Sequence, residues 1–233
     1  IYTLSLHDAL PICHHVPFYP SEAAVSHWRF GGSSLSGWRM IDVRTGQPAF
    51  VKRYGAEQFC MNNPDFQKAY RDYLRQLLRD TRLNGLMSDD GTFYGRWTVC
   101  GCAHCRQRFK REYGHRLPPV SNGRFWCNLE NEAFKDWIAM RFAVARDFLG
   151  MVRKVVPAGV ALLTCCSSSD DAYLAECGMT YEDFVRHCDV VMLEMCGSTP
   201  SLRGNWDGNM ASQLLHAGIA RDHRRPCLGL GYG

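Results

Sequence analysis

Apolar residues recur at three- and four-residue spacing in two long stretches of this chain, and this spacing predicts amphipathic helices. The first stretch covers 64–78, and Asn63 before it is a typical helix cap, with Pro64 at the first helical position. The second covers 132–156 and is the longest predicted helix. It ends there because Pro157 prevents its continuation. Both helices present a wide apolar face, which indicates that they pack against a core.

Three shorter helices complete the predicted helical part. One covers 104–113 and ends at Gly114, a residue that favours the left-handed conformation of a helix C-terminus. Another begins after Thr180, which forms a Thr-x-x-Asp capping box with Asp183. Apolar residues at helical spacing within 210–219 predict the third.

Continuous apolar runs between these helices predict buried strands. Strands that alternate with helices and are apolar throughout are typical of a parallel sheet covered by helices, so we expect an α/β fold. Polar or acidic residues follow the carboxyl ends of the runs, where a (β/α)₈ barrel carries its active site. A doubly wound open sheet has the same local pattern, although no Gly-x-Gly-x-x-Gly loop follows a strand. The four runs are 86–87, 160–165, 190–193 and 226–230.

The N-terminal part of the sequence has a different character. Residues 1–12, IYTLSLHDALPI, resemble a translated sequencing-adaptor read and lack the basic start of a signal peptide. We therefore expect the native sequence to enter near Cys13, with its true N-terminus missing. Residues 14–47 are rich in Gly, Ser, Trp and Pro and predict a long loop near a binding site. We interpret 13–233 as part of one domain.

Composition excludes several classes of function. The net charge of +4 is spread along the chain, so we expect no nucleic-acid partner. No apolar run approaches the roughly 20 residues that span a bilayer, so we expect no membrane segment. The 12 cysteines do not indicate a secreted disulfide framework, because 46% hydrophobic residues are enough for a core. We therefore expect a reducing compartment and a cytoplasmic location.

Three cysteines within six residues carry the strongest chemical signal. Cys100, Cys102 and Cys105 can turn around one cation, and zinc prefers four thiolate ligands in a tetrahedron. Cys60, which lies just ahead of a predicted helix, is the best candidate for the fourth ligand, and His104 is the alternative. Four thiolates leave no open coordination position, so the predicted zinc site is structural. The competing interpretation is a group of buried free thiols.

The segment from Cys60 to Gly114 resembles glycoside hydrolase family 42. The likeness comprises Cys60-Met61-Asn62-Asn63-Pro64, a helix, a strand that ends in an acidic pair, and the Cys-x-Cys-x-x-Cys motif with its following helix. Those enzymes are β-galactosidases with a barrel catalytic domain, and several bind zinc through cysteines at this spacing. The resemblance extends over roughly 45–230. It implies a partial (β/α)₈ TIM barrel that contains roughly strands 4 to 7 with their flanking helices.

The resemblance also implies roles for three carboxylates. Asp90 stands where the family has its general acid/base glutamate, and Asp89 replaces an asparagine. The family's nucleophilic glutamate closes the seventh strand, which here ends near Gly231 without a carboxylate. Glu194, at the end of the sixth-strand candidate, remains as a partner. Two alternatives remain for the pair of carboxylates that glycoside hydrolysis requires: Asp90 with Glu194, or Asp89 with Asp90.

Each of these residues also has an ordinary interpretation. Asp89-Asp90 before Gly91 is compatible with a plain turn, and Glu194 with an ion pair at the barrel rim. The resemblance therefore implies hydrolysis of a β-linked glycoside, and the alternative is a barrel that binds carbohydrate without catalysis. We expect a partial barrel to be inactive alone. The complete protein could form a homo-oligomer. Aromatic residues near strand ends could stack on sugar or anchor loops: Phe93, Tyr94, Trp97, Trp126, Trp206 and Tyr232.

Overall fold

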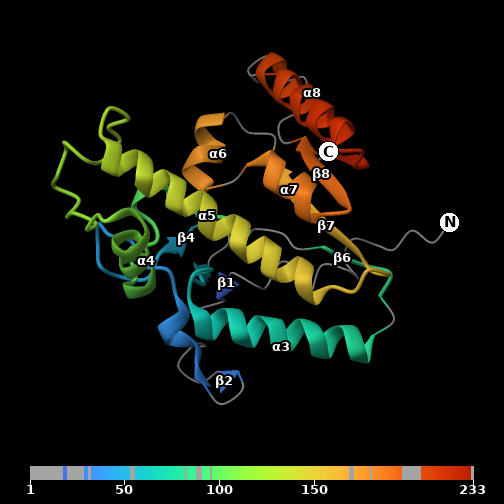
Figure 1. Cartoon of the computed structure of the whole chain (residues 1–233), viewed down its shortest axis with the longest axis horizontal. Coiled ribbons are helices and arrows are strands. Elements are labelled where there is room, and N and C mark those ends of the chain that lie inside the picture. The colour runs from blue at the N-terminus through green and yellow to red at the C-terminus, as the bar shows by residue number, and fades with distance from the viewer. Residues whose placement is uncertain are drawn as a thin grey trace.

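Four parallel strands form the central sheet, in the order β6-β7-β8-β9 (Figure 1). A computed structural model describes residues 18–19, 29–30, 33–52, 56–81, 83–87, 91–94, 96–167, 171–178, 180–195 and 206–231. The strands are β6 (Gly85–Met87), β7 (Ala161–Ser167), β8 (Val190–Met195) and β9 (Cys227–Gly231). All three strand pairs are parallel, with Leu86 beside Leu162 and Val191 beside Cys227. The predicted α/β class and its four strands are confirmed, and the sheet is consistent with part of an α/β barrel.

Helices α3 (Pro64–Asp80) and α5 (Glu132–Val155) pack side by side, as Figure 1 shows. The predicted cap of α3 is confirmed, because the side chain of Asn63 accepts hydrogen bonds from two backbone N–H groups at 2.9 and 3.2 Å. Aromatic rings fill the contact between the helices. Phe148 stacks on Phe66 at 5.8 Å and on Tyr70 at 5.6 Å between ring centroids. This contact supplies much of the buried apolar surface that stabilises the fold.

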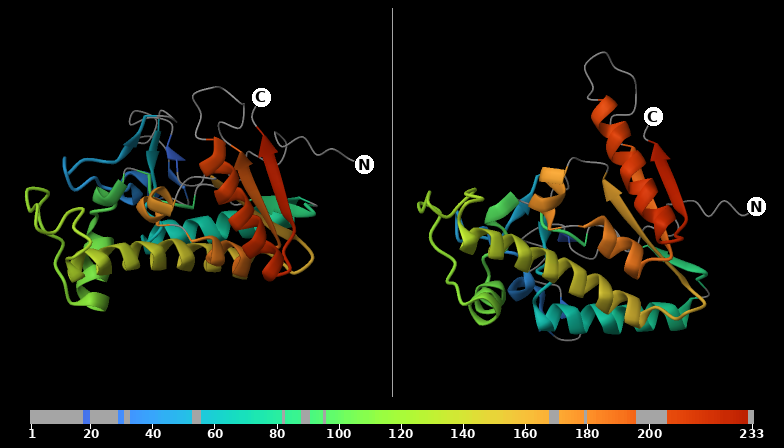
Figure 2. Two further views of the ribbon diagram at one scale, coloured as in Figure 1. Left: turned by 90° about the horizontal axis from the view of Figure 1, so that it is seen from above. Right: turned by 45° about the horizontal axis from the view of Figure 1, so that its top comes forward.

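Three described helices follow β7 in the chain. They are α6 (Asp171–Cys177), α7 (Tyr181–His187) and α8 (Trp206–Asp222). Helix α7 packs on β7 and β8, and α8 runs alongside β9 in both views of Figure 2. The capping box before α7 is confirmed, with Asp183 N–H donating to Thr180 Oγ1 at 3.2 Å and the hydroxyl donating back at 2.7 Å. Helix α6 was not expected from the sequence.

A small antiparallel sheet lies near α4 (Ala103–Tyr113), away from the parallel sheet (Figure 1). Its order is β1-β5-β4, and a separate two-stranded ribbon pairs β2 with β3. The long loop predicted over 14–47 is therefore wrong in part. Strands of two residues are too short to show a period-two pattern in sequence, which explains the error. The strands are β1 (Phe18–Tyr19), β2 (Arg29–Phe30), β3 (Ser33–Ser34), β4 (Phe50–Val51) and β5 (Ala56–Gln58).

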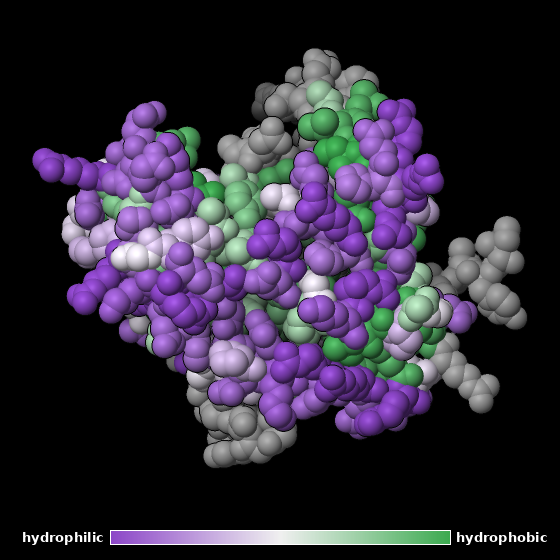
Figure 3. Space-filling view, viewed as in Figure 1, coloured by the Kyte–Doolittle hydropathy of each residue, from purple (hydrophilic) through white to green (hydrophobic). Residues whose placement is uncertain are grey.

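Three exposed large hydrophobic side chains of the described part lie on α8 and β9. Leu214 and Leu215 on α8 are 66% and 55% exposed, and Leu228 on β9 is 49% exposed. Figure 3 shows hydrophobic surface gathered over this helix, whereas hydrophilic residues cover most of the rest of that face. None of the described helices combines the length and the hydropathy needed to cross a bilayer.

An ion pair at the amino ends of the strands leads to a prediction about pH. Asp189, just before β8, accepts hydrogen bonds from Leu162 N–H at 2.9 Å and from Arg153 Nη1 at 2.6 Å. Burial alone would raise the pKa of Asp189, but these donors and the charge of Arg225 lower it overall. A folded-state pKa below the unfolded value stabilises the fold above about pH 4, and this stabilisation is lost as pH falls through the folded value.

We therefore expect Asp189→Asn to lower the free energy of unfolding by about 1 kcal/mol at pH 7, a figure reduced for solvent screening of a partly exposed pair. The difference from wild type should shrink as the pH falls toward about 3. Urea unfolding with chelator in every sample measures it. Asp222→Asn is the control, since Asp222 is 75% exposed and only 3.8 Å from Arg221. An equal loss in both variants, or a loss that grows in acid, would contradict the prediction.

Candidate metal centre and strand-end site

Four cysteine sulfurs converge at one point beside α4. Cys60 lies between β5 and α3, Cys100 and Cys102 lie between η3 (Arg96–Thr98) and α4, and Cys105 is in the first turn of α4. Their Sγ atoms all lie within 4.8 Å of one another. The Sγ of Cys60 is 3.5 Å from that of Cys102 and 3.6 Å from that of Cys105. The predicted four-cysteine cluster is confirmed, and these sulfurs are too far apart for a disulfide bond.

The spacing of the sulfurs fits a four-coordinate cation. A tetrahedral site with Zn–S bonds of about 2.3 Å places its sulfurs about 3.8 Å apart, close to the separations between these thiols. Among the described residues the converging set is formed by the four cysteines, so the geometry favours Cys60 over His104 as fourth ligand. Cys60, Cys100 and Cys105 are fully buried and Cys102 is half-buried. The arrangement can hold a cation but offers it little access to solvent.

The thiols share their protons through hydrogen bonds. Hydrogen bonds with Cys100, and then with Cys105 and Cys60, hold the pKa of Cys102 far below its ordinary value. Hydrogen bonds with Cys100 and Cys102 raise the pKa of both Cys60 and Cys105 well above the ordinary value, and burial adds to this. The thiolate form is therefore favoured more at Cys102 than at Cys60 or Cys105, and Cys102 lies at the N-terminus of α4, where the helix dipole also favours negative charge. Because a bound cation requires thiolates, acid should weaken its binding.

Donors outside the cluster orient two of the sulfurs. The backbone N–H of Ile41 donates to Cys100 Sγ at 3.4 Å, and Asn62 Nδ2 approaches Cys105 Sγ at 3.8 Å. Arg108 holds the Asn62 amide through a 3.3 Å bond to Oδ1, and its other terminal nitrogen bonds Asp147 of α5 at 2.6 Å. Such supporting bonds fix the direction of metal ligands. The cluster is therefore tied both to the segment before β4 and to α5.

Gly101 between two of the cysteines leads to a second prediction. A Cβ at this position would overlap the Cγ2 methyl of Val43, whereas Gly159 has open space around it. Because χ1 of the β-branched Val43 side chain is restricted, relieving this overlap requires strain, so Gly101→Ala should cost about 1–3 kcal/mol and loosen the ligand loop. Chemical unfolding and zinc titration of Gly101→Ala and of the control Gly159→Ala test this. If the two alanine variants behave alike, the close packing at Gly101 has no energetic role.

The loop from β6 to the cysteines is held along its described length by buried groups. The amide of Gln58 donates to Thr92 O at 2.5 Å and accepts from Tyr94 N–H at 3.0 Å. The N–H of Phe93 donates to Cys177 O at 2.8 Å, and the indole of Trp137 donates to Trp97 O at 2.8 Å. The sequence analysis did not identify Gln58, because its partners lie more than 30 positions away and leave no local pattern.

Of the three predicted carboxylate residues, Glu194 has a described backbone, and this backbone lies near the carboxyl edge of the sheet. Glu194 belongs to β8 and is in register with Ser167 of β7 and Leu230 of β9. Its side chain lies outside the described part. Asp89 and Asp90, which follow β6 in the chain, also lie outside the described residues. The structure therefore brings together the four cysteines but does not give the separation of the three carboxyl groups.

Three aromatic residues that could have stacked on sugar are anchors of the core. Phe93 is fully buried. Trp97 packs edge-on against Phe134 at 5.6 Å, and Trp126 packs against Phe125 at 5.0 Å. Tyr94 is half-buried, while Tyr232 and the side chain of Trp206 lie outside the described part.

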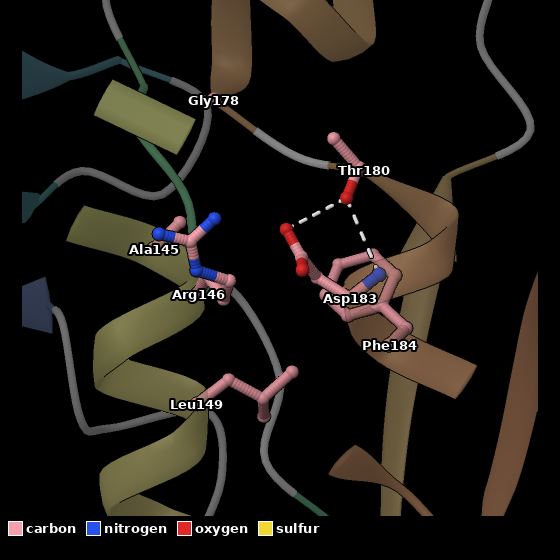
Figure 4. Close-up of a pocket in the computed structure, with 7 residues that line it drawn as sticks. All are labelled: Ala145, Arg146, Leu149, Gly178, Thr180, Asp183 and Phe184. Carbon is pink, nitrogen blue, oxygen red and sulfur yellow. Dashed lines mark hydrogen bonds between the residues drawn. The ribbon is translucent and has the colours of Figure 1, made fainter. Parts of the chain in front are cut away.

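Neither of the two hollows found in the described part contains a predicted catalytic residue. The first, between α5 and α7, is large enough for about one water molecule (Figure 4). In Figure 4 Arg146 and Leu149 of α5 face Asp183 and Phe184 of α7 across it. The second lies at the amino ends of the strands, beside Asp189. The first is too small for a sugar and the second lies at the amino ends of the strands, so neither is a candidate for the site.

Comparisons with known proteins support the fold. No protein-family model matches the chain. No curated protein matches it either. Among solved structures, the glycoside hydrolase domain of PgaB (BpsB) from Bordetella bronchiseptica is similar, with a TM-score of 0.62 and 13% sequence identity. The match covers 84% of this chain and 64% of that one, so the chain spans less than two thirds of the neighbour's length. The chain therefore has a glycoside hydrolase-like α/β fold.

Proposed function

We propose that the four-cysteine cluster binds one structural zinc ion. The convergence of four sulfurs within 4.8 Å carries this proposal, because it supplies the ligand type and number that zinc prefers. Cys60 would join the segment before α3 to the loop before α4, which contributes Cys100 and Cys102. The ion would act as a cross-link between parts of the chain that are far apart in sequence. A closed set of four thiolates leaves no position for a substrate.

We further propose that the protein hydrolyses a β-linked glycoside at the carboxyl edge of the sheet, within a (β/α)₈ barrel to which 13–233 belong. The observation that supports it is the parallel direction of β6, β7 and β8, because Glu194 lies near the carboxyl end of β8 and Asp89-Asp90 follow the carboxyl end of β6 in the chain. Carboxyl groups about 5–5.5 Å apart would retain configuration, and groups about 6.5–9.5 Å apart would invert it. The exposed Leu228 of β9 supports the barrel, whose next unit would cover it.

A second function is favoured by one observation. Strand β9 ends at Gly231 without a carboxylate, although the resemblance to family 42 implies a nucleophile there. A barrel that has lost this group and retains the surrounding surface would bind carbohydrate without cleaving it. Both functions require carbohydrate binding, but only the hydrolase cleaves the sugar, so an assay of turnover distinguishes them.

Metal analysis and a substrate panel test these proposals. Purified protein dialysed against metal-free buffer should retain about one zinc per chain, and a content near zero would contradict the metal centre. Hydrolysis of aryl β-glycosides should be assayed in a form with the complete barrel, because this chain spans 64% of its neighbour's length. Release of the aryl group supports the hydrolase. Saturable sugar binding without release supports the binding protein.

A further inference from the structure

Arg141 is a fully buried cation in the middle of α5. Its Nε donates to Val99 O at 2.9 Å, and its Nη2 donates to Arg96 O at 2.8 Å and to Glu176 O at 2.5 Å. The guanidinium also lies over the rings of Phe93 and Trp97, 4.7 and 5.5 Å from their centroids. All these hydrogen-bond acceptors are neutral backbone carbonyls.

No carboxylate among the described residues forms an ion pair with Arg141, and its Nη1 is buried without a hydrogen bond there. A buried cation without a paired counter-charge costs free energy, and negative charge nearby would offset this cost. Burial lowers the pKa of Arg141 to about 10, and the groups that oppose this shift are Cys177, Cys105, Glu176 and Cys100. Two of these four are members of the cysteine cluster.

The contacts of Arg141 fall on the segment that delivers the cysteine ligands. Val99, whose carbonyl accepts from Nε, directly precedes Cys100, and Arg96 begins η3. A divalent cation with four thiolates keeps two negative charges, which a dry site must offset. We propose that Arg141 is the positioning residue and counter-charge of the metal centre. The hydrogen bonds of its guanidinium to Val99 O and Arg96 O fix 96–99 so that Cys100 reaches the cation. Its positive charge offsets the negative charge of the four thiolates. This inference rests on the proposed zinc site.

The test is the zinc affinity of Arg141→Met, Arg141→Lys and a matched control. Arg153→Met is the control because Arg153 also donates to backbone carbonyls from α5, yet lies twelve positions, about 18 Å, further along the helix. Competition with a chromophoric chelator measures affinity. Supporting groups around metal ligands typically contribute 10–100-fold, so Arg141→Met should weaken zinc binding by that factor. Arg141→Lys keeps the positive charge but loses the branched guanidinium, so its zinc affinity should fall less. Arg153→Met should bind zinc as wild type does.

A second measurement separates this role from simple structural support. The midpoint of thermal unfolding is compared with zinc and with chelator for each variant. If Arg141 only stabilises the core, Arg141→Met lowers both midpoints equally and leaves zinc affinity unchanged, which overturns the proposal. If Arg141→Met does not fold, Arg141→Lys decides: at least about a threefold loss of affinity supports the proposal, and wild-type affinity overturns it. Wild-type protein that binds no zinc refutes the metal centre itself, a result distinct from wild-type binding that Arg141 does not affect.

Discussion

Cys105→Ser should abolish stoichiometric zinc binding and lower the midpoint of thermal unfolding by about 10 °C or more. Cys105 is fully buried, and its Sγ is 3.6 Å from that of Cys60, so serine at this position removes one of four ligands from a closed site. The free energy of binding a structural zinc ion adds directly to the free energy of folding. Metal content after dialysis and calorimetry of wild type and variant measure the two effects.

Two other cysteines serve as controls for this experiment. Cys127 is exposed and Cys177 is buried outside the cluster. Cys127→Ser should retain both zinc and stability. Cys177→Ser should lose some stability through its buried hydroxyl but keep one zinc per chain. If Cys105→Ser keeps a full equivalent of zinc, or if all three variants lose it alike, the cluster is not the metal site.

Local sequence patterns predicted the elements that depend on neighbouring residues. The Asn63-Pro64 start of α3, the Thr180 capping box and the αL residue Gly114 all rest on interactions within a few positions, and all three are confirmed. The four parallel strands were also recognisable, because strands buried on both faces are apolar throughout. Helix α6 was not predicted, since seven residues are too few to show a helical period clearly.

The cysteine cluster was predictable for a chemical reason rather than a structural one. Cys100, Cys102 and Cys105 lie within six residues, and thiols at this spacing are typical of a metal site, so their convergence could be expected. The supporting groups are different. Asn62 and Gln58 contact partners more than 30 positions away, so these contacts could not be inferred from neighbouring residues. Their roles depend on how α3, α4 and the small sheet pack together.

The buried face of α5 shows where periodicity alone was misleading. The apolar residues at helical spacing within 132–156 include Phe142, which is only half-buried, whereas Met140 and Arg141 are fully buried. A helix that packs against α3, α4 and α7 buries more than one stripe of its surface. An arginine four positions after Trp137 breaks the apolar pattern, and that break is the signal by which Arg141 could have been found.

Asp90→Asn should reduce kcat/KM for glycosides with poor leaving groups by about 10²–10⁴-fold in the form with the complete barrel. As general acid, Asp90 would protonate the departing oxygen, so activated aryl glycosides, which leave without a proton, should lose far less. Substitution of the nucleophile should slow both substrate classes alike, because both need the same attack at the sugar carbon. Comparing Glu194→Gln with Asp89→Asn therefore identifies which of the two has that role.

The control for the Asp90, Asp89 and Glu194 variants is Glu130→Gln. It removes a carboxylate away from the strand ends, because Glu130 is exposed in the loop before α5. Its turnover should equal that of wild type on every substrate. Aspartate is one methylene shorter than the glutamate of family 42, which the sequence resembles, so an acid at Asp90 would need a closer approach of the sugar for a proton transfer over about 3 Å. If Asp90→Asn turns over both substrate classes like Glu130→Gln, Asp90 is not the acid. If all three strand-end variants do so, the carboxyl edge of this sheet has no part in hydrolysis.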